Sequence, residues 1–304
     1  MFDLTNKSDS SDNISENDIQ NDTLLDSFRY INGRRYHNNS EVSYFLPNDE
    51  NEVDRLNFQH SLLKYAWQGN YSSPVQERLA EGKARVLDVG RCGTGKWILE
   101  MSCDYQNSTF IGLDISPIFP DPSETPQNVA FLQCNVNDGI PFPDNTFDFV
   151  FQRFFSKYVT AKQWKDVTQE IVRVTKPGGW IEFFEDDIEY EEIDHFCLQI
   201  LNATKKGNPH PSAIIPSTLQ TIPELSTVHH KKVSIPIGKW GGKLGELISK
   251  LHIKTFQNFA FIMTSTLNIS NETHNDICEV VAQGFDINKV SSITYRWFAQ
   301  KKIT

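Results

Sequence analysis

The chain has 304 residues, 38% of them hydrophobic, which suits one large α/β domain or two small ones. Its net charge is −10, and this acidic balance argues against non-specific binding to nucleic acid, which needs clustered lysine and arginine. No run of residues approaches the ~18 apolar residues of a membrane span, and the N-terminus lacks the pattern of a signal peptide. We therefore expect neither membrane nor nucleic-acid partners, and a cytoplasmic or nuclear location.

Residue types that form disulfides or bind metals show no organised spacing. The five cysteines are odd in number and scattered, which predicts a reduced protein without disulfides. The histidines show neither the H-E-x-x-H spacing nor the Cys/His spacing of zinc sites. We therefore expect no metal.

The chain divides into three regions. Residues 1–27 hold seven acids and one lysine, and their composition predicts a disordered acidic tail. Residues 28–84 are expected to form an N-terminal helical cap, because apolar residues recur at helical spacing from Val53 to Trp67. The remainder, 85–304, is expected to be one domain with a proline-punctuated insertion at about 185–226, on the substrate side.

A short apolar run at 86–89 includes Asp88 and leads into a turn with three glycines, Gly90, Gly93 and Gly95. An apolar helical pattern follows. This order is typical of the first strand-to-helix connection in a nucleotide-type α/β fold. Glycines let the backbone approach a ligand closely, and the helix N-terminus offers free N–H groups.

Two phosphate-binding patterns fit this turn only in part. A G-x-x-x-x-G-K loop fits residues 90–96, but Trp97 stands where Ser or Thr would hold Mg²⁺. A G-x-G-x-x-G dinucleotide fingerprint lacks its third glycine, because Ile98 occupies that position. An ordinary glycine-rich turn is the further alternative.

The segment at 109–117 is predicted to hold a second buried strand that ends in an acid, Asp114, where an acid can accept hydrogen bonds from ribose hydroxyls. A third strand is predicted at 129–135, and at 140–151 a turn with two prolines is expected to lead into a fourth strand, which Gln152 and Arg153 end. A helix is predicted over Ala161–Val174, and the Lys176–Gly179 turn is expected to launch a strand over Trp180–Phe184. Strands that alternate with helices predict a parallel sheet covered on both faces.

The last third of the chain continues the alternation. A strand is predicted at 228–237, a helix at 242–259, a shorter helix at 276–284 and a last, antiparallel strand at 292–299.

The order of these motifs resembles that of the class I S-adenosylmethionine-dependent methyltransferases. The segments that carry the likeness are V-L-D-V-G…G-T-G at 86–95, G-L-D-I-S-P at 112–117, I-P-F-P-D-N-T-F-D at 140–148 and K-P-G-G-W at 176–180. Residues 33–38, 44–50 and 52–60 resemble the N-terminal signature of the fungal LaeA/UMTA-type (TAM-domain) methyltransferases, and 237–246 is similar to their G-x-W-G-x-x-L-G-E motif. The resemblance covers about residues 28–304.

The resemblance implies a Rossmann-like fold with a seven-stranded, mostly parallel sheet, an antiparallel last strand and an N-terminal helical lid. It also implies S-adenosylmethionine as cofactor. Asp88 would hold the loop or reach the amino group of the cofactor through water. The other implied contacts are the three glycines with the methionine end, Asp114 with the ribose, Ile115 with the adenine face, Asn135 and Val136 with the adenine edge, and Gln152 and Arg153 with the region of the transferred methyl.

Two further sets of residues have alternative interpretations. Arg55 and His60 match the N-terminal signature, so they are expected either to act in a lid or to form helix-surface ion pairs. The acidic run at 185–187 either supplies a proton acceptor or, as we expect, forms a solvated loop.

The sequence departs from the family in its glycine turn, where two residues, Arg91 and Cys92, stand between the first two glycines instead of one. The alternative function is therefore an inactive methyltransferase-like scaffold in a regulatory protein complex. Methyl transfer from a sulfonium needs a base only when the nucleophile starts protonated, so the motifs do not identify the acceptor. A small metabolite and a protein both remain open.

Overall fold

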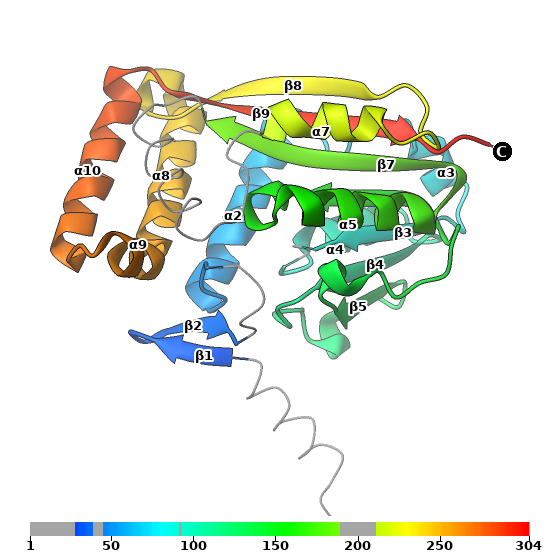
Figure 1. Cartoon of the computed structure of the whole chain (residues 1–304), viewed down its shortest axis with the longest axis horizontal. Coiled ribbons are helices and arrows are strands. Elements are labelled where there is room, and N and C mark those ends of the chain that lie inside the picture. Colours follow the sequence, from blue (N-terminus) through cyan, green and yellow to red (C-terminus); the bar gives the residue numbers. More distant parts are fainter. Residues whose placement is uncertain (1–27, 39–44, 91–92, 189–210, 304) are drawn as a thin grey trace, which may run out of the picture.

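The computed structural model describes residues 28–38, 45–90, 93–188 and 211–303. Its centre is a seven-stranded sheet with the strand order β5-β4-β3-β6-β7-β9-β8 (Figure 1). The strands are β3 (Arg85–Val89), β4 (Thr109–Asp114), β5 (Val129–Gln133), β6 (Phe147–Arg153), β7 (Thr175–Ile188), β8 (His229–Pro236) and β9 (Ser291–Gln300).

The pairing confirms the predicted fold class. Strands β5, β4, β3, β6 and β7 pair in parallel, whereas β9 runs antiparallel between β7 and β8. A separate two-stranded hairpin, β1 (Phe28–Ile31) and β2 (Arg34–His37), precedes the sheet. The helices are α2 (Glu50–Trp67), α3 (Gln76–Ala80), α4 (Lys96–Asp104), α5 (Ala161–Val174), α7 (Pro211–Gln220), α8 (Gly242–Asn258), α9 (Ala260–Leu267) and α10 (Asn271–Ile287).

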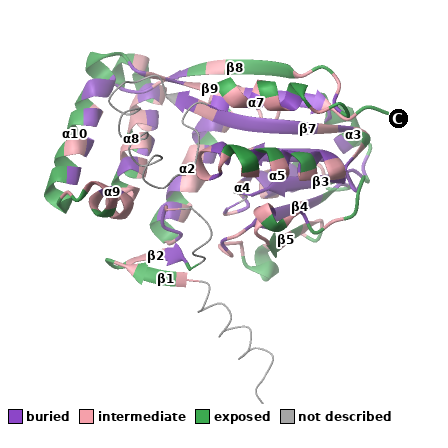
Figure 2. Ribbon diagram, viewed as in Figure 1, coloured by how far each residue is buried: buried purple, intermediate pink, exposed green. Residues whose placement is uncertain are grey.

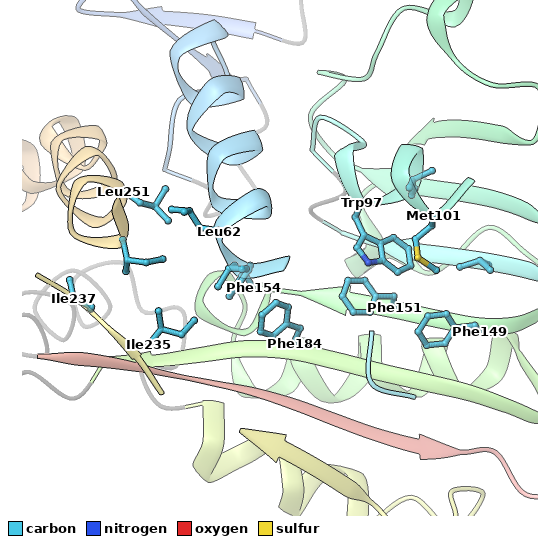
Figure 3. Packing of buried hydrophobic residues seen from close by; sticks show 14 of the residues in the cluster. Leu62, Trp97, Met101, Phe149, Phe151, Phe154, Phe184, Ile235, Ile237 and Leu251 are labelled. Carbon is cyan, nitrogen blue, oxygen red and sulfur yellow. The ribbon is translucent and has the colours of Figure 1, made fainter. Parts of the chain in front are cut away.

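Each face of the sheet has its own apolar core, as alternation along the strands requires. On β6, Phe149 and Phe151 face α2, α4 and α8, whereas Val150 faces α5 and α7. Figure 3 shows the first core, which extends from Trp97 and Met101 of α4 to residues of α2 and α8. The central strands are accordingly buried, whereas the edge strand β8 is largely exposed (Figure 2).

The predicted helices are present in the structure, with differences in the bounds of some of them. The predicted helix over Ala161–Val174 matches α5, whose N-terminus carries a capping box between Thr160 and Gln163. The helix predicted at 276–284 is longer in the structure, because Ser270 caps it at residue 271. The sequence analysis did not identify α9, α7 or the β1–β2 hairpin.

The predicted turn at Lys176–Gly179 is wrong. Strand β7 already begins at Thr175, which pairs with Phe147, and the ladder shifts register before it resumes at Phe149 and Trp180. Glycine allows this irregularity, because Gly178 adopts a positive φ of +79° within the strand. The strand therefore extends beyond the predicted segment at both ends.

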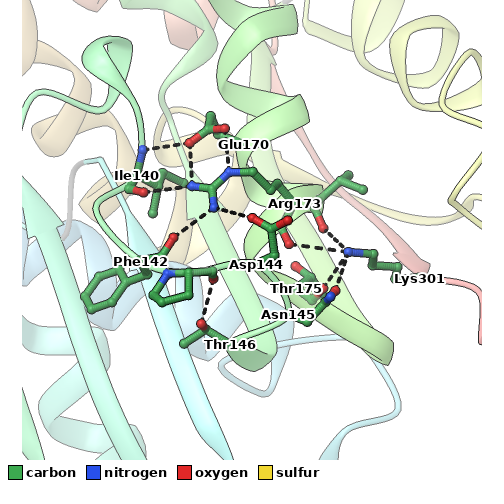
Figure 4. Close-up of polar contacts among 11 residues, drawn as sticks. Ile140, Phe142, Asp144, Asn145, Thr146, Glu170, Arg173, Thr175 and Lys301 are labelled. Atoms are coloured by element: carbon green, nitrogen blue, oxygen red, sulfur yellow. Dashed lines mark hydrogen bonds and ion pairs between the residues drawn. The ribbon is translucent and has the colours of Figure 1, made fainter.

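The proline-containing segment at 140–145 is held by an arginine of α5 (Figure 4). Arg173 donates to the carbonyls of Ile140 and Phe142 at 2.8 Å and also contacts the Asp144 carboxylate at 2.8 Å. Lys301, near the C-terminus, donates to three backbone carbonyls around the start of β7. These contacts fix the connection that feeds β6.

Several predictions fall on residues that are not described. These are the tail at 1–27, the extra residues at 91–92 and positions 189–210 of the predicted insertion. The rest of that insertion is split between the end of β7 and helix α7. Among the described residues, no helix has the length and apolar character needed to cross a membrane.

Candidate active site

The predicted site residues gather at the carboxyl ends of β3, β4 and β6. Asp88 lies on β3, Asp114 ends β4, and Gln152 stands beside Val89 across the β3–β6 ladder. The sheet order reverses between β3 and β6, and ligands of open α/β sheets bind at such a point. The sequence analysis thus identified residues from three strands that the fold brings to one edge.

Asp88 and Gln152 are buried polar groups without hydrogen-bond partners among the described residues. The Asp88 side chain is almost fully buried, and both carboxylate oxygens lack a partner. Burial raises the pKa of Asp88 to about 7; the charge of Arg153 opposes this shift, and the charge of Asp114 adds to it. Both ends of the Gln152 carboxamide also lack partners. Such orphaned groups are costly in a core, which fits a site that binds a polar ligand.

The glycine turn lies closely against aromatic side chains. Gly90 and Gly95 have φ values of +52° and +69°, which favour glycine. A Cβ at Gly90 would lie 3.1 Å from the ring of Phe155, and one at Gly95 would overlap the ring of Phe131. The connection from β3 to α4 therefore needs glycine at these two positions, both for the backbone conformation and for the space that a side chain would fill.

Asp114 bridges two loops. One carboxylate oxygen accepts from the backbone N–H of Gly93 at 2.8 Å, and the other accepts from the N–H of Ser116 at 2.9 Å. The intervening Ile115 is only partly buried, and its carbonyl accepts from Gln133. Asp114 and the glycine turn are thus in direct contact.

The two residues predicted at the adenine edge differ in their surroundings. Val136 is buried and would lie 3.3 Å from a Cβ at Gly90, so it is beside the glycine turn. The Asn135 side chain instead caps a short 3-10 helix, accepting from the N–H of Asn137 and donating to Asp138. Its carboxamide is therefore engaged within its own loop.

A polar chain connects Arg153, at the end of β6, to helix α2. Arg153 lies 3.0 Å from Nδ1 of His60, and Nε2 of His60 lies 3.1 Å from a carboxylate oxygen of Glu100. Burial lowers the pKa of His60 to about 4, so its imidazole is neutral at pH 7 and accepts from Arg153. Burial opposes ionisation of Glu100, but hydrogen bonds from Lys64 and His60 outweigh it and lower the pKa of Glu100 to about 2.

Arg55 forms one of the expected ion pairs, the one with Glu52, but the pair is buried and does not lie on the helix surface. The pair makes two contacts, with nitrogen–oxygen distances of 2.6 and 2.7 Å. Asn258 of α8 donates to the same carboxylate at 2.6 Å, and Arg55 donates to Thr255 of α8 at 3.1 Å. The pair therefore joins α2 to α8 inside the protein.

The N-terminal region also contacts the site through residues that the sequence analysis did not single out. Asn57 of α2 accepts from the Thr94 hydroxyl at 2.6 Å, and Asn48 donates to the Ser116 hydroxyl at 2.7 Å. Their positions inside the predicted N-terminal signature were the only signal available. Helix α2 and the segment before it thus cover the glycine turn and the end of β4.

The acidic run is not a solvated loop, which corrects the expectation. It lies within β7, and Glu185 is completely buried while accepting from the N–H groups of Phe155 and Ser156. Burial raises the pKa of Glu185 to about 7, against these hydrogen bonds. Asp186 pairs with Lys157 at 2.9 Å. The pattern was misjudged because three consecutive acids are uncommon inside a strand of a central sheet.

Two small cavities lie under α2 and share a wall made by Gln59 and Phe154. The first opens beside the glycine turn, and the second lies toward α8 and β9. The first cavity is also lined by Leu56, His60, Gly93, Thr94 and Arg153, and the second by Leu63, Asp186, Ile235, Ile248, Leu251, His252, Ser292 and Thr294. Within the described ranges, no group of three or more His, Cys, Asp or Glu side chains is arranged to hold a metal.

Comparison with known proteins agrees with this geometry. A methyltransferase domain model matches residues 86–179. Methyltransferase pytC of Aspergillus terreus is 31% identical over 229 residues, which cover 70% of this chain and 67% of pytC. The chain belongs to the fungal LaeA-like class I methyltransferases. The matches to other relatives cover different fractions of the length of those proteins.

Two of these relatives carry the LaeA name. Secondary metabolism regulator LAE1 of Cochliobolus heterostrophus is 34% identical over 161 residues, and the match covers 52% of this chain and half of LAE1. Protein-methionine methyltransferase laeA of Emericella nidulans is 28% identical over 233 residues, which cover 72% of this chain and 60% of laeA. S-adenosylmethionine, predicted from the motifs, is the cofactor of this methyltransferase family.

The residues of the LaeA-like site fit that cofactor. The Asp88 carboxylate and the Gln152 carboxamide, which have no hydrogen-bond partner within the described ranges, suit a ligand with a charged amino-acid end. The positive-φ glycines at 90 and 95 leave the space that a side chain would fill. Asp114 has the two acceptor oxygens that a pair of ribose hydroxyls needs, and each of them accepts a backbone N–H in this structure.

Proposed function

We propose that this protein transfers a methyl group from S-adenosylmethionine to an acceptor molecule. The observation that carries the proposal is the convergence of Asp88, Asp114 and Gln152 with the glycine turn at one sheet edge. Family membership supports the reaction class. The relatives do not identify the acceptor. LAE1 is named a secondary metabolism regulator, whereas laeA of Emericella nidulans is named a protein-methionine methyltransferase.

In this proposal, each of these residues contacts a different part of the cofactor. Asp114 binds the ribose hydroxyls, exchanging its present backbone donors for them. Asp88 faces the amino group, where a cation restores its ordinary ionisation. The glycine turn, with Gly90, Gly93 and Gly95, lies along the methionine end. Ile115, Asn135 and Val136 border the adenine, and Gln152 and Arg153 lie near the transferred methyl.

The cofactor supplies an activated sulfonium, and in-line displacement at its methyl needs little covalent help from the protein. The chain's own contribution is to orient the reactants and to exclude water. Helix α2 suits that task, because its Asn57 contacts Thr94 of the glycine turn and its His60 contacts Arg153 at the end of β6. Arg153 remains positioned by His60 while the acceptor approaches.

The decisive experiment is calorimetric titration of the full chain with S-adenosylhomocysteine. We expect micromolar affinity for the wild type and a loss of at least ~10-fold in the Asp114→Ala variant, since a ribose contact to a charged group contributes about 1.5–3 kcal/mol. Asp121→Ala is the matched control, because Asp121 is an exposed acid that only caps a short helix nearby. Absence of binding at millimolar ligand would refute the proposal.

A second candidate function is a methyltransferase-like scaffold that acts through protein contacts. The observation in its favour is that both Asp114 oxygens accept backbone N–H groups in this structure, as they would in a site that never takes a ribose. Regulators such as LAE1 are consistent with it. Deleting Arg91 separates the two: a gain from no affinity to micromolar affinity would favour the scaffold, whereas unchanged or lower affinity favours the enzyme.

A further inference from the structure

The carboxyl-terminal part of β7 holds the loop that follows β6. The carbonyl of Phe184 accepts from the loop at residue 154, the Glu185 carboxylate at residues 155 and 156, and the Asp186 carboxylate at residue 157. The loop follows Arg153, the last residue of β6, which the proposed function places near the transferred methyl. The acidic run therefore fixes a segment that begins at the candidate site.

Glu185 makes three hydrogen bonds to this loop. One carboxylate oxygen accepts from the N–H groups of Phe155 at 2.7 Å and Ser156 at 3.1 Å, and the other accepts from the Ser156 hydroxyl at 2.9 Å. The glutamate side chain is completely buried. All three partners are donors, which suits a carboxylate, because that group only accepts. The backbone of Phe155 is thus held by a buried side chain from the neighbouring strand.

The Phe155 ring forms a wall beside the glycine turn. It lies so close to Gly90 that a Cβ at that position would be 3.1 Å from the ring. Phe155 is itself buried in the core on the α5 face, together with Val136, whose side chain also lies beside Gly90. Since the proposed function places this turn along the methionine end of the cofactor, the position of the ring determines the space that this end has.

We propose that Glu185 is a positioning residue for the cofactor: it holds the backbone of Phe155, fixes the aromatic wall beside Gly90, and so sets the affinity for the amino-acid end of S-adenosylmethionine. This inference rests on the proposed function. Glu185 does not touch the cofactor in this arrangement and acts on it only through Phe155.

Two substitutions separate the hydrogen bonds of Glu185 from its charge. Glu185→Met leaves the buried N–H groups of Phe155 and Ser156 without this acceptor, and a buried donor without an acceptor is costly enough to displace the loop. Glu185→Gln keeps one oxygen for both N–H groups, while its NH2 group can donate to the Ser156 hydroxyl oxygen. We therefore expect only the methionine variant to displace the Phe155 ring.

The test is calorimetric titration of the full chain with two ligands at pH 8, above the pKa of about 7 of Glu185, so that this side chain is ionised. S-adenosylhomocysteine carries the amino-acid end, whereas methylthioadenosine has the same nucleoside and sulfur without it. We expect Glu185→Met to lower the affinity for S-adenosylhomocysteine by about 10-fold, the equivalent of one lost hydrogen bond to a charged group, and the affinity for methylthioadenosine by less than about twofold. Glu185→Gln should bind both ligands like the wild type.

Asp148→Leu is the matched control for general loss of stability. Asp148 is also a buried carboxylate that accepts a backbone N–H, that of Arg85 at 2.8 Å, but it lies at the opposite end of β6 from the glycine turn. Asp148→Leu should lower the unfolding temperature and keep the wild-type affinity for both ligands.

A double variant tests whether the effect passes through the aromatic ring. Phe155→Leu alone should lower the affinity for S-adenosylhomocysteine, and adding Glu185→Met should lower it little further, because both changes remove the same wall. If Glu185→Met does not fold, Ser156→Ala provides the milder change, since it removes only the hydroxyl donor. That variant should lower the affinity for S-adenosylhomocysteine by about threefold and leave methylthioadenosine binding unchanged.

The outcomes separate this inference from the function on which it depends. Failure of the wild type to bind S-adenosylhomocysteine removes the proposed function itself. Normal wild-type binding leaves the cofactor site standing, and three results would then overturn only the role of Glu185. These are wild-type affinity in the folded Glu185→Met and Ser156→Ala variants, equal losses for the two ligands, and additive losses in the double variant.

Discussion

Nδ1 of His60 lies 3.0 Å from Nη1 of Arg153, so the helix that covers the site is tied to the end of β6 through a neutral imidazole. The same ring faces Glu100 of α4 at 3.1 Å. Three elements that surround the candidate cofactor site therefore depend on one buried side chain. Protonation of that side chain would place a second cation against Arg153.

This contact predicts a pH dependence of stability. Burial depresses the pKa of His60 to about 4 in the folded protein, below the ordinary value of 6.5. The unfolded chain therefore binds more protons than the native chain between these values, so the stabilisation is complete above pH 6.5 and is lost as the pH falls toward 4. We expect His60 to account for on the order of 2 kcal/mol of the loss in unfolding free energy between pH 7 and pH 5.

Urea denaturation of the wild type and His60→Gln at the two pH values measures this contribution. The variant should lose less stability on acidification than the wild type. The exposed His230→Gln variant should behave like the wild type. Equal losses in wild type and His60→Gln would contradict the assignment of a neutral, buried His60.

The buried pair of Glu52 and Arg55 predicts a large effect from removing one partner. Arg55→Met should lower the unfolding free energy by about 3–5 kcal/mol, because it leaves a buried carboxylate whose remaining donor is Asn258. The double variant Glu52→Gln/Arg55→Met should recover part of this loss. Chemical denaturation of the two single variants and the double variant gives the coupling energy, and simple additivity would show that the two residues act independently.

Much of the architecture followed from the sequence because strand alternation and glycine turns are local signals. The predicted strand ending at Asp114 coincides with the end of β4, and the predicted helix over Ala161–Val174 coincides with α5. The turn at Lys176–Gly179 was wrong because the register shift on β6 is a property of two strands, not of one segment. Glycine and proline there mark an irregularity inside a ladder, and sequence alone does not distinguish this from a loop.

The position of the candidate site residues in the fold could be predicted only where they lie on strands or at strand ends. Asp88, Asp114 and Gln152 are on or at the ends of strands that the topology brings together. Contacts across long separations had no local signal: Asn57 meets Thr94, and Asn48 meets Ser116. The burial of Glu185 was missed for the same reason, since the N–H groups that satisfy it come from a segment 29 or 30 residues earlier.

The contact of Asn57 with Thr94 predicts how long the cofactor stays bound. Removing it should loosen α2 over the glycine turn at a cost of about 1 kcal/mol, the ordinary contribution of a hydrogen bond. We expect Asn57→Ala to release S-adenosylhomocysteine about 5-fold faster than the wild type in stopped-flow measurements. Ser61→Ala, on the exposed side of the same helix, is the control and should leave the rate unchanged. A faster release in both variants would indicate general weakening of α2.

The last prediction concerns clearance at the glycine turn and compares two glycines with similar backbones. Gly95 and Gly33 both have positive φ, at +69° and +76°, but only the Cβ of an alanine at 95 would overlap a ring, that of Phe131. Each Ala variant should pay the cost of a left-handed residue, about 1 kcal/mol. Only Gly95→Ala should also lower affinity for S-adenosylhomocysteine, by more than 10-fold, because the turn must move away from Phe131.

Thermal unfolding and calorimetric titration of Gly95→Ala and Gly33→Ala check both parts of this prediction. A Gly33→Ala variant with unchanged affinity shows that strain alone does not affect the site, since that residue has open space around it in the β1–β2 hairpin. Unchanged affinity in Gly95→Ala would mean that the cofactor does not depend on the close packing of the turn against Phe131.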